Sequence, residues 1–467
     1  MKFFTAFLTA IVLLSLPACA RDFYFGADLS FANEMNDCGA VYRENGKPAD
    51  IYSIFKDHGA NLVRIRIWNN ASWTKYSNLG DVERSIRRAK ALGLQVLLDF
   101  QYSDDWADAG KQLVPAAWAG IKDDGELANV LYKYTFDTLT VLDKAGLMPD
   151  LVQLGNEINS EILMAAPWRK GQTINWTRNA KLLNAAIRAV RDAGATSQIK
   201  PKVMLHIAQP ENVETWFADA TAAGVTDFDM IGISYYTKWS HETLAGLGAT
   251  INRLRYRYPN VQVMVAETGY PWTLQGADST NNVLGEDALM SPYRATPEGQ
   301  KQYLIDLTQT VIADGGAGVV YWAPDWVSTN CRTRWGLGSS WENATFFDFQ
   351  GNVLPAIDFM QHSYNWPVEV TFRFHGLALP PGRPFFLWGD FIGSRQFAIR
   401  LPDDGKPLDY ITTMMPGQKI QFQVFDNLSL HARLISGGTV VNGFATETIP
   451  DKNVVYDITL SMPAAAP

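Results

Sequence analysis

Residues 61–100 read NLVRIRIWNN ASWTKYSNLG DVERSIRRAK ALGLQVLLDF, a succession of patterns that recurs along most of the chain. Two mostly apolar runs, 61–68 and 94–100, flank a helical pattern that begins at Asp81 and that Gly93 stops. The runs are nearly continuous rather than alternating, as is typical of parallel strands covered on both faces. This stretch therefore predicts a strand–helix–strand unit with two parallel strands.

The same alternation extends in both directions from this unit. Apolar runs alternate with amphipathic segments between residues 23 and 362, which predicts an α/β fold, a (β/α)8 TIM barrel. A doubly wound open sheet is the competing fold, but no G-x-G-x-x-G follows the first run and no phosphate-binding loop is present. The expected strands are Phe23–Ala27, Asn61–Trp68, Leu94–Phe100, Leu151–Leu154, Lys202–Ile207, Asp229–Ser234, Val261–Ala266 and Gly318–Trp322.

Near Pro367 the helical periodicity gives way to strand-like runs separated by Pro-Gly, Asp-Gly and Gly-Gly pairs. We therefore expect a C-terminal all-β, sandwich-like domain over 367–463, after a barrel domain over 21–362. Trp366, Trp388 and the Phe385–Phe386 pair in this tail could stack on sugars, although strand aromatics more often belong to a core.

The first twenty residues have the pattern of an export signal, with a charged start, an apolar run and small residues before a cleavage site. We expect residues 1–20 to be a signal peptide and the protein to be periplasmic or extracellular. Lipid anchoring through Cys19 is the alternative. No later run is long and apolar enough to span a membrane.

The composition favours a globular protein: 467 residues, 47% of them hydrophobic and 19% charged, with a net charge of −8. The acidic balance argues against nucleic acid as a partner. Three cysteines are too few for a disulfide-held scaffold. We expect a monomer that needs no cofactor.

Two glutamates stand where barrel enzymes keep their catalytic groups, at the carboxyl ends of strands. Glu157 follows the fourth expected strand directly after Asn156, and Glu267 follows the seventh. Two carboxyl groups that face each other across an opening are what glycoside hydrolysis needs, one as acid and one as nucleophile or base. Each glutamate alone could equally be a salt-bridged residue at the rim.

The sequence motifs around these residues resemble those of glycoside hydrolase family 53, the arabinogalactan endo-β-1,4-galactanases. The resemblance rests on motifs that occur in order through 23–360, namely Gly26–Ser30, Lys56–Gly59, Arg64–Trp68, Tyr102–Asp108, Gly155–Asn159, Glu267–Pro271 and Trp341–Asn343. It implies an endo-acting, retaining enzyme that cleaves β-1,4-galactosidic bonds in galactan and type I arabinogalactan side chains of pectin.

The resemblance also implies roles for individual residues. Glu157 would be the acid/base and Glu267 the nucleophile, with Asn156 on the sugar 2-hydroxyl. Arg64 and Tyr236 would contact Glu267, and Trp322 would floor the cleavage subsite. The residues expected to shape the cleft are Asp28, Asp104, Asp105 and Trp106.

Some expectations stay open at this point. We expect Arg64 and Arg66 to point opposite ways, so that one of them is structural, and Trp322 could be plain core. The family commonly has His where Gln101 stands, which should adjust a sugar contact. If the barrel closes, Cys38 and Cys331 lie in neighbouring loops and could form a disulfide, or remain free thiols.

The long loop 268–295 carries Asp278, Asn281, Asn282, Glu286 and Asp287, oxygen ligands that could hold a structural Ca²⁺ ion, as some family members do. A solvated polar loop is the alternative. No His/Cys cluster suggests zinc. The competing functions are another retaining endo-glycanase, such as a β-mannanase, and a non-catalytic carbohydrate-binding protein.

Overall fold

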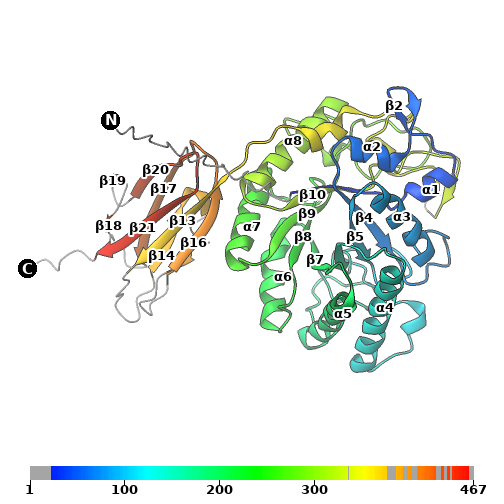
Figure 1. The fold of residues 1–467 in the computed structure, drawn as a ribbon, viewed down its shortest axis with the longest axis horizontal. Helices are drawn as coiled ribbons and strands as arrows, with labels where there is room; N and C mark the ends of the chain where they lie inside the picture. Colours follow the sequence, from blue (N-terminus) through cyan, green and yellow to red (C-terminus); the bar gives the residue numbers. More distant parts are fainter. Residues whose placement is uncertain are drawn as a thin grey trace, which may run out of the picture.

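A closed barrel of parallel strands forms the larger part of the molecule (Figure 1). The computed structural model describes residues 23–334, 336–375, 385–392, 395, 398–401, 408–426, 433–435, 439–441 and 444–461. The order around the barrel is β1-β10-β9-β8-β7-β6-β5-β4, which confirms the predicted (β/α)8 architecture. Its strands are β1 (Tyr24–Asp28), β4 (Leu62–Ile67), β5 (Gln95–Phe100), β6 (Leu151–Leu154), β7 (Lys202–Ala208), β8 (Met230–Tyr235), β9 (Gln262–Thr268) and β10 (Gly318–Tyr321).

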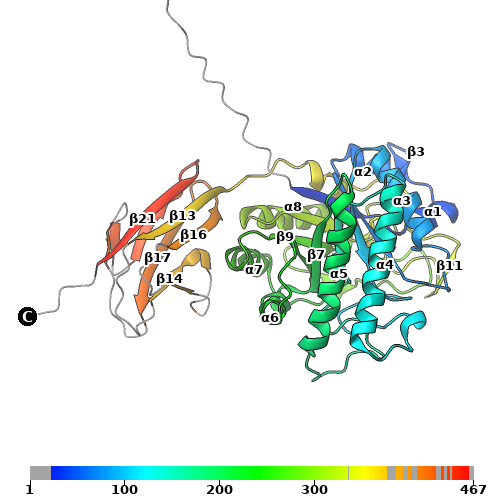
Figure 2. The ribbon, with the colours of Figure 1, turned by 60° about the horizontal axis from the view of Figure 1, so that its bottom comes forward.

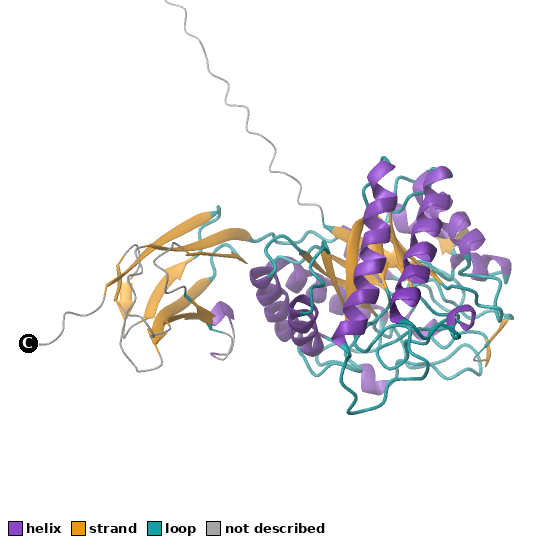
Figure 3. Cartoon of the chain, turned by 90° about the horizontal axis from the view of Figure 1, so that it is seen from below, coloured by secondary structure: helices purple, strands orange, loops and turns teal. Residues whose placement is uncertain are grey.

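Helices surround this barrel, as the secondary-structure colouring shows (Figure 3). Most of the barrel strands are followed by an α-helix, whereas the long segment after β10 ends in the 3-10 helix η4 (Pro355–Gln361), which packs on α8. The backbone is extended at both ends of η4, at Leu354 and His362, so the eighth helix is only a short turn. The surrounding helices are α2 (Ile51–Asp57), α3 (Leu79–Ala91), α4 (Asp124–Lys144), α5 (Trp176–Thr196), α6 (Pro210–Ala222), α7 (Leu244–Arg257) and α8 (Pro297–Ala313).

Long loops that follow the strands carry the remaining short elements of this region. They are α1 (Ala32–Asp37), β2 (Arg43–Glu44), β3 (Lys47–Pro48), η1 (Ala116–Trp118), η2 (Glu286–Ala288), β11 (Arg332–Thr333), β12 (Gly336–Leu337) and η3 (Glu342–Ala344). A disulfide joins two of these loops, Cys38 to Cys331, with 5.7 Å between their Cα atoms. The pairing fits the neighbouring positions of β1 and β10 in the closed barrel.

The C-terminal region is built of two β-sheets (Figure 2). A four-stranded sheet has the order β16-β13-β21-β18, and a five-stranded sheet has the order β15-β14-β17-β20-β19. Alternate residues of β13 are buried in the core, and Phe372 packs edge-on against Phe422 of the other sheet. The strands are β13 (Val368–His375), β14 (Phe385–Gly389), β15 (Ile399–Arg400), β16 (Leu408–Met414), β17 (Lys419–Asp426), β18 (Arg433–Ile435), β19 (Thr439–Val441), β20 (Phe444–Thr448) and β21 (Val454–Ser461), with η5 (Asp390–Ile392) between β14 and β15.

Helix α7 of the barrel contacts strand β16 of this β-rich region through a buried polar cluster. Asn252 donates from Nδ2 to Oγ1 of Thr412 at 2.7 Å and accepts from the hydroxyl of Tyr410 at 3.1 Å. The ring of Tyr256 packs against Tyr410 at 4.9 Å between centroids. Because these contacts combine hydrogen bonds with aromatic packing, the two regions are joined by more than the connecting chain.

Of the aromatic residues expected to form a sugar platform in the tail, only Phe386 and Trp388 share a half-buried face of β14, where Arg395 lies over Trp388 and over Phe425. Phe385 is buried in the sandwich core, whereas Phe386 stacks on Phe425. Trp366 packs edge-on against Phe23 at the barrel. Sugar binding by the tail therefore stays a prediction. Within the described part of the chain, no helix is long and apolar enough to cross a membrane.

Candidate active site

Glu157 is held at the barrel mouth by an unusual backbone path. Strand β6 ends at Leu154, and the next residues include Gly155 at φ +85° and Glu157 at φ +47°. A left-handed backbone conformation destabilises a non-glycine residue by about 1–3 kcal/mol. Such strained residues are typically found at functional sites. A Cβ at Gly155 would lie 2.4 Å from Cγ2 of Ile158, so glycine is needed both for conformation and for space.

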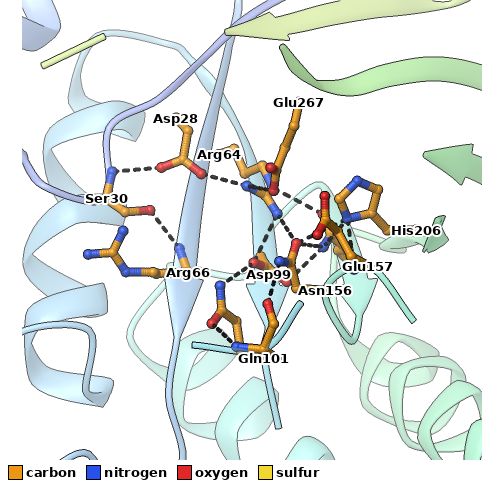
Figure 4. Close-up of polar contacts among 12 residues, drawn as sticks. Asp28, Ser30, Arg64, Arg66, Asp99, Gln101, Asn156, Glu157, His206 and Glu267 are labelled. Carbon is orange, nitrogen blue, oxygen red and sulfur yellow. Dashed lines mark hydrogen bonds and ion pairs between the residues drawn. The ribbon is translucent and has the colours of Figure 1, made fainter. Parts of the chain in front are cut away.

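Glu267 projects into the same opening from the end of β9. It pairs in register with Ser234 of β8, just after an irregularity in that ladder. Glu157 and Glu267 both line a cavity of about 240 Å³, and their carboxyl groups point toward one another (Figure 4). The structure therefore brings the two predicted carboxyl groups together.

Arg64 lies beneath this cavity and connects its polar groups (Figure 4). It comes from β4, is 1% exposed, and contacts Glu267 at 2.8 Å and Asp28 at 2.7 Å through Nη1. Through Nη2 it contacts Asp99 at 3.0 Å and Oδ1 of Asn156 at 2.8 Å. One guanidinium thus fixes the nucleophile candidate and the residue that precedes Glu157.

The two glutamates titrate under opposing influences. Burial and the nearby Glu157 raise the pKa of Glu267, while the attraction of Arg64 lowers it. Burial also raises the pKa of Glu157, while a side-chain hydrogen bond from Ser234 lowers it. Only Glu267 touches a cation directly, and it also accepts from the Tyr236 hydroxyl at 3.1 Å. When the pair holds one proton, we therefore place that proton on Glu157.

Tryptophans line the cavity around the carboxyl groups. Trp322 follows β10 and packs edge-on against Trp341 at 4.7 Å between ring centroids. Trp106 also packs edge-on against Trp322, with 5.9 Å between the two ring centroids. Trp106 and Trp322 also line an adjoining cavity of about 430 Å³, so the two spaces form one continuous aromatic groove. Trp322 is therefore a lining residue rather than plain core.

The adjoining cavity is charged at its outer part. Asp105 lies 2.7 Å from both Lys111 and Arg334, and all three residues line the cavity. Burial alone would raise the pKa of Asp105, but Lys111 and Arg334 lower it, so the carboxylate stays ionised. The groove thus runs from two carboxyl groups toward a fixed cluster of ions.

Two of the residues expected to shape the cleft lie elsewhere. Asp28 is 1% exposed and supports Arg64 from below, while its other oxygen accepts from the backbone of Ser30. Asp104 is outside both cavities and accepts from the backbone nitrogens of Asn70 and Ala116 at 2.8 Å. Asp28 and Asp104 therefore position other groups of the site.

Of the two arginines on β4, Arg64 contacts Glu267 and Arg66 is structural, as expected, but the expectation that they point opposite ways is wrong. Residues two apart on a strand share a face, so both side chains point inward. Arg66 stacks on Phe31 and Trp106, with its guanidinium carbon 4.1 Å and 4.4 Å from the two ring centres. Arg66 is thus a support beneath the aromatic groove.

Gln101, which stands where the family commonly has His, is occupied by protein partners. Its carbonyl accepts from the indole of Trp68 at 2.8 Å and from the backbone nitrogen of Ala107 at 3.2 Å. Its amide points to Asp99 at 3.4 Å. Gln101 therefore holds the wall of the groove in place and is 3% exposed.

The structure adds residues to the site that the strand-end search did not reach. Asp99, Gln153, His206 and Ser234 lie within strands, below the glutamates, and Trp239 and Trp341 come from loops. The signal for the first four was a polar side chain inside an otherwise apolar strand, a position that burial makes costly without a partner.

Two acidic groups of the loop that could hold calcium have protein partners. Asp278 accepts from Ser328, Ser339 and Thr280 at 2.6–2.8 Å, and Asp287 lies 2.9 Å from Lys238. Among the residues that the structure describes, no group of three or more His, Cys, Asp or Glu side chains could hold a metal ion.

A closed (β/α)8 barrel with two buried carboxyl groups facing each other at the ends of its fourth and seventh strands is typical of glycoside hydrolases. Residues 24–360 match the sequence profile of glycosyl hydrolase family 53. The chain therefore belongs to glycosyl hydrolase family 53.

Relatives and solved structures agree with this assignment. The chain is 51% identical to an arabinogalactan endo-beta-1,4-galactanase of Cellvibrio japonicus over 362 residues, covering 77% of this chain and 96% of that protein. It is 32% identical to an endo-beta-1,4-galactanase of Bacillus subtilis, covering 73% and 86%. The Ignisphaera aggregans GH53 catalytic domain superposes with a TM-score of 0.67 at 32% identity, covering 75% of this chain and 98% of that domain.

Proposed function

We propose that this protein is an endo-acting glycoside hydrolase that cleaves β-1,4-galactosidic bonds in galactan and type I arabinogalactan side chains of pectin, with retention. The observation that carries the proposal is the buried pair Glu157 and Glu267 in one cavity, of which only Glu267 is bound to Arg64. Membership of the family and the names of the relatives support the substrate.

In the first step, Glu267 attacks the anomeric carbon while Glu157 protonates the leaving glycosidic oxygen. The bond from carbon to the leaving oxygen breaks as the bond to Glu267 forms. Arg64 and the Tyr236 hydroxyl keep the attacking carboxylate charged and fix its direction. Burial keeps a proton on Glu157 because it raises the pKa of that group.

In the second step, Glu157 acts as a base on a water molecule, which displaces Glu267 from the sugar. The same carboxyl group thus gives a proton and later takes one back. Because each displacement inverts the anomeric carbon, the product keeps the configuration of the substrate.

Sugar recognition is assigned to the groove around the pair. Trp322 offers an apolar face to the ring at the cleavage point, and Trp106 continues this surface into the adjoining cavity. One N–H of Asn156 goes to the carbonyl of Ala107, which leaves its second N–H for the sugar 2-hydroxyl.

Product analysis on a panel of polysaccharides tests the proposal. Soluble galacto-oligosaccharides of retained configuration are expected from β-1,4-galactan, and Glu157→Gln or Glu267→Gln should lower the rate by several orders of magnitude. Glu298→Gln, at the solvent side of the first turn of α8, is the control and should be fully active. Release from β-mannan alone would favour the related endo-mannanase, and binding of galactan without cleavage would favour a carbohydrate-binding protein.

The remaining assignments are part of the same proposal. Residues 1–20 would be removed on export, with lipid attachment at Cys19 as the alternative, and both lie outside the described residues. The chain would divide into a catalytic domain over 21–362 and an accessory domain over 367–463, which fits a family match that ends at residue 360. N-terminal sequencing of the exported protein and expression of the two parts test these points.

Two assignments about the assembly complete the proposal. We expect a monomer, which light scattering of the purified protein would test. A structural Ca²⁺ ion in loop 268–295 remains the weaker expectation, because Asp278 and Asp287 already have protein partners. Thermal unfolding with Ca²⁺ and with a chelator should give the same midpoint if the loop holds no ion.

A further inference from the structure

A buried histidine and a serine lie directly below Glu157. His206 is on β7, fully buried, and its Nε2 is 2.9 Å from Oγ of Ser234 on β8. Its Nδ1 is 3.3 Å from the backbone nitrogen of Glu157, which donates to it. Gly232, the register partner of His206, leaves room for the ring, since a Cβ there would lie 3.2 Å from Cδ2.

These contacts decide which ring nitrogen of His206 carries the proton. The backbone N–H of Glu157 and Nε2 of Gln153, the latter 3.0 Å away, both donate toward Nδ1. Oδ1 of Asn156 also lies 3.1 Å from Nδ1, but it already accepts from Arg64 and Gln153, so Nδ1 presents its lone pair. Burial and the charge of Arg64 lower the pKa of His206, so the ring is neutral. The single ring proton therefore resides on Nε2 and is donated to Ser234.

With the ring proton on Nε2 of His206, the Ser234 hydroxyl cannot donate to His206 and must donate to another acceptor. Its oxygen is taken by the imidazole N–H, so its O–H is free to point to another acceptor. Glu157 is the acceptor beside it, since the Ser234 side chain lowers the pKa of that carboxyl group. We infer that Ser234, oriented by neutral His206, is a positioning residue that donates a hydrogen bond to the carboxylate of Glu157.

This inference rests on the proposed role of Glu157 as the acid/base. The donor stabilises the ionised form that Glu157 takes after it has given its proton away, and it fixes the carboxyl in the cavity. The other groups that act on the titration of Glu157 are Asp108, Arg64, the backbone N–H of Ala109 and the coupled Glu267, and Tyr236 lies near both glutamates.

The pH profile of kcat/KM on β-1,4-galactan tests the inference. Ser234→Ala removes a donor to the charged form, so the pKa of Glu157 rises and the alkaline limb should move up by about one pH unit. The rate on a 2,4-dinitrophenyl galactobioside should not show this limb shift, because its leaving group needs no proton. A purely structural role would affect both substrates alike.

Variants of His206 test the orienting part. His206→Gln retains an N–H near the position of Nε2, so the alkaline limb of the kcat/KM profile should stay where it is. His206→Phe has no such donor and should move this limb as Ser234→Ala does. The double variant His206→Phe/Ser234→Ala should show no further shift. Ser85→Ala, a buried serine on α3 bonded to Asn33, is the matched control and should leave the profile unchanged.

Two results would overturn the inference. One is an unchanged alkaline limb in Ser234→Ala on galactan, while Glu157→Gln is inactive, which would leave the proposed function intact. The other is a limb in His206→Gln that moves as far as in His206→Phe. Full activity of Glu157→Gln would instead remove the proposed role of Glu157 itself.

Discussion

Nη1 of Arg64 lies 2.8 Å from Oε1 of Glu267, and both side chains are buried. The same guanidinium faces Asp28 and Asp99, so one cation offsets three carboxyl groups below the cavity. In such a cluster the cation determines both where charge resides and whether the buried carboxylates are tolerated at all.

Replacing Arg64 should therefore damage activity and stability together. Arg64→Gln leaves Asp28 and Asp99 without their cation, and loss of one partner of a buried ion pair costs about 3–5 kcal/mol. We expect a lower free energy of unfolding in urea and a large loss of kcat. Arg84→Gln, which removes a half-exposed pair with Asp37, should cost less than about 1 kcal/mol. Equal effects of the two substitutions would contradict this account of Arg64.

The acid side of the pH profile should report the nucleophile. Burial raises the pKa of Glu267, and only the ionised form attacks, so activity is lost as the pH falls through that raised pKa. The acid limb of kcat/KM should therefore lie above the usual glutamate value of about 4.3. Arg64→Lys keeps a charge but shifts it away, which should move the limb further up. A limb at or below about 4 would contradict the assignment.

The Tyr236 hydroxyl should matter for rate and little for stability. Tyr236→Phe removes the donor to Oε2 of Glu267, and we expect kcat to fall by about 10- to 100-fold. Tyr235→Phe is a matched control, because the neighbouring hydroxyl donates outward to the carbonyl of Glu242. Steady-state kinetics and thermal unfolding of both variants distinguish the two hydroxyls. A rate loss shared by both would point to disturbance of strand β8.

Gly155→Ala should displace Glu157. The new Cβ would lie 2.4 Å from Cγ2 of Ile158 at a backbone position with φ +85°, so both strain and overlap oppose it. We expect loss of stability of several kcal/mol and loss of activity. Gly93→Ala shares the positive φ but meets no atom within 4 Å, so it should cost only about 1 kcal/mol and remain active. If both variants behave alike, packing against Ile158 is not the cause.

Reduction of the Cys38–Cys331 disulfide should lower the unfolding temperature. The bond closes a loop of 293 residues, and cross-links of long loops contribute up to about 4–5 kcal/mol in the chain-entropy description. It also holds the chain just before β11, next to Arg334 of the outer cavity. We expect weaker binding of long galactan chains in Cys38→Ser/Cys331→Ser, measured by calorimetry. Unchanged unfolding and unchanged binding would contradict the structural role of this bond.

The fold and the positions of the two glutamates at the barrel mouth could be predicted because each depends on local sequence patterns. Continuous apolar runs gave the strands, and Glu157 and Glu267 stood where such runs end. The element after the eighth barrel strand does not follow the regular strand–helix alternation, because η4 is a short 3-10 helix with a loop-like sequence pattern. The sheet order confirmed the neighbouring positions of the loops that carry Cys38 and Cys331.

The supporting residues could not be predicted in the same way. His206, Ser234 and Gln153 come from different strands, and their hydrogen bonds depend on side-chain layers inside the barrel. Asp104 lies beside Asp105 in sequence but accepts from the backbone of its own loop and of the loop after β4, rather than facing the groove. Such assignments need the three-dimensional positions of donors and acceptors.

The most direct test of the central claim is to identify the residue that becomes bonded to sugar. The protein is incubated with 2,4-dinitrophenyl 2-deoxy-2-fluoro-β-galactobioside, which slows release of the glycosyl-enzyme, and the labelled peptide is sequenced by mass spectrometry. We predict a single adduct on Glu267, formed faster in the unaltered protein than in Arg64→Lys. An adduct on another residue, or rapid turnover with inverted product and no adduct, would contradict the account.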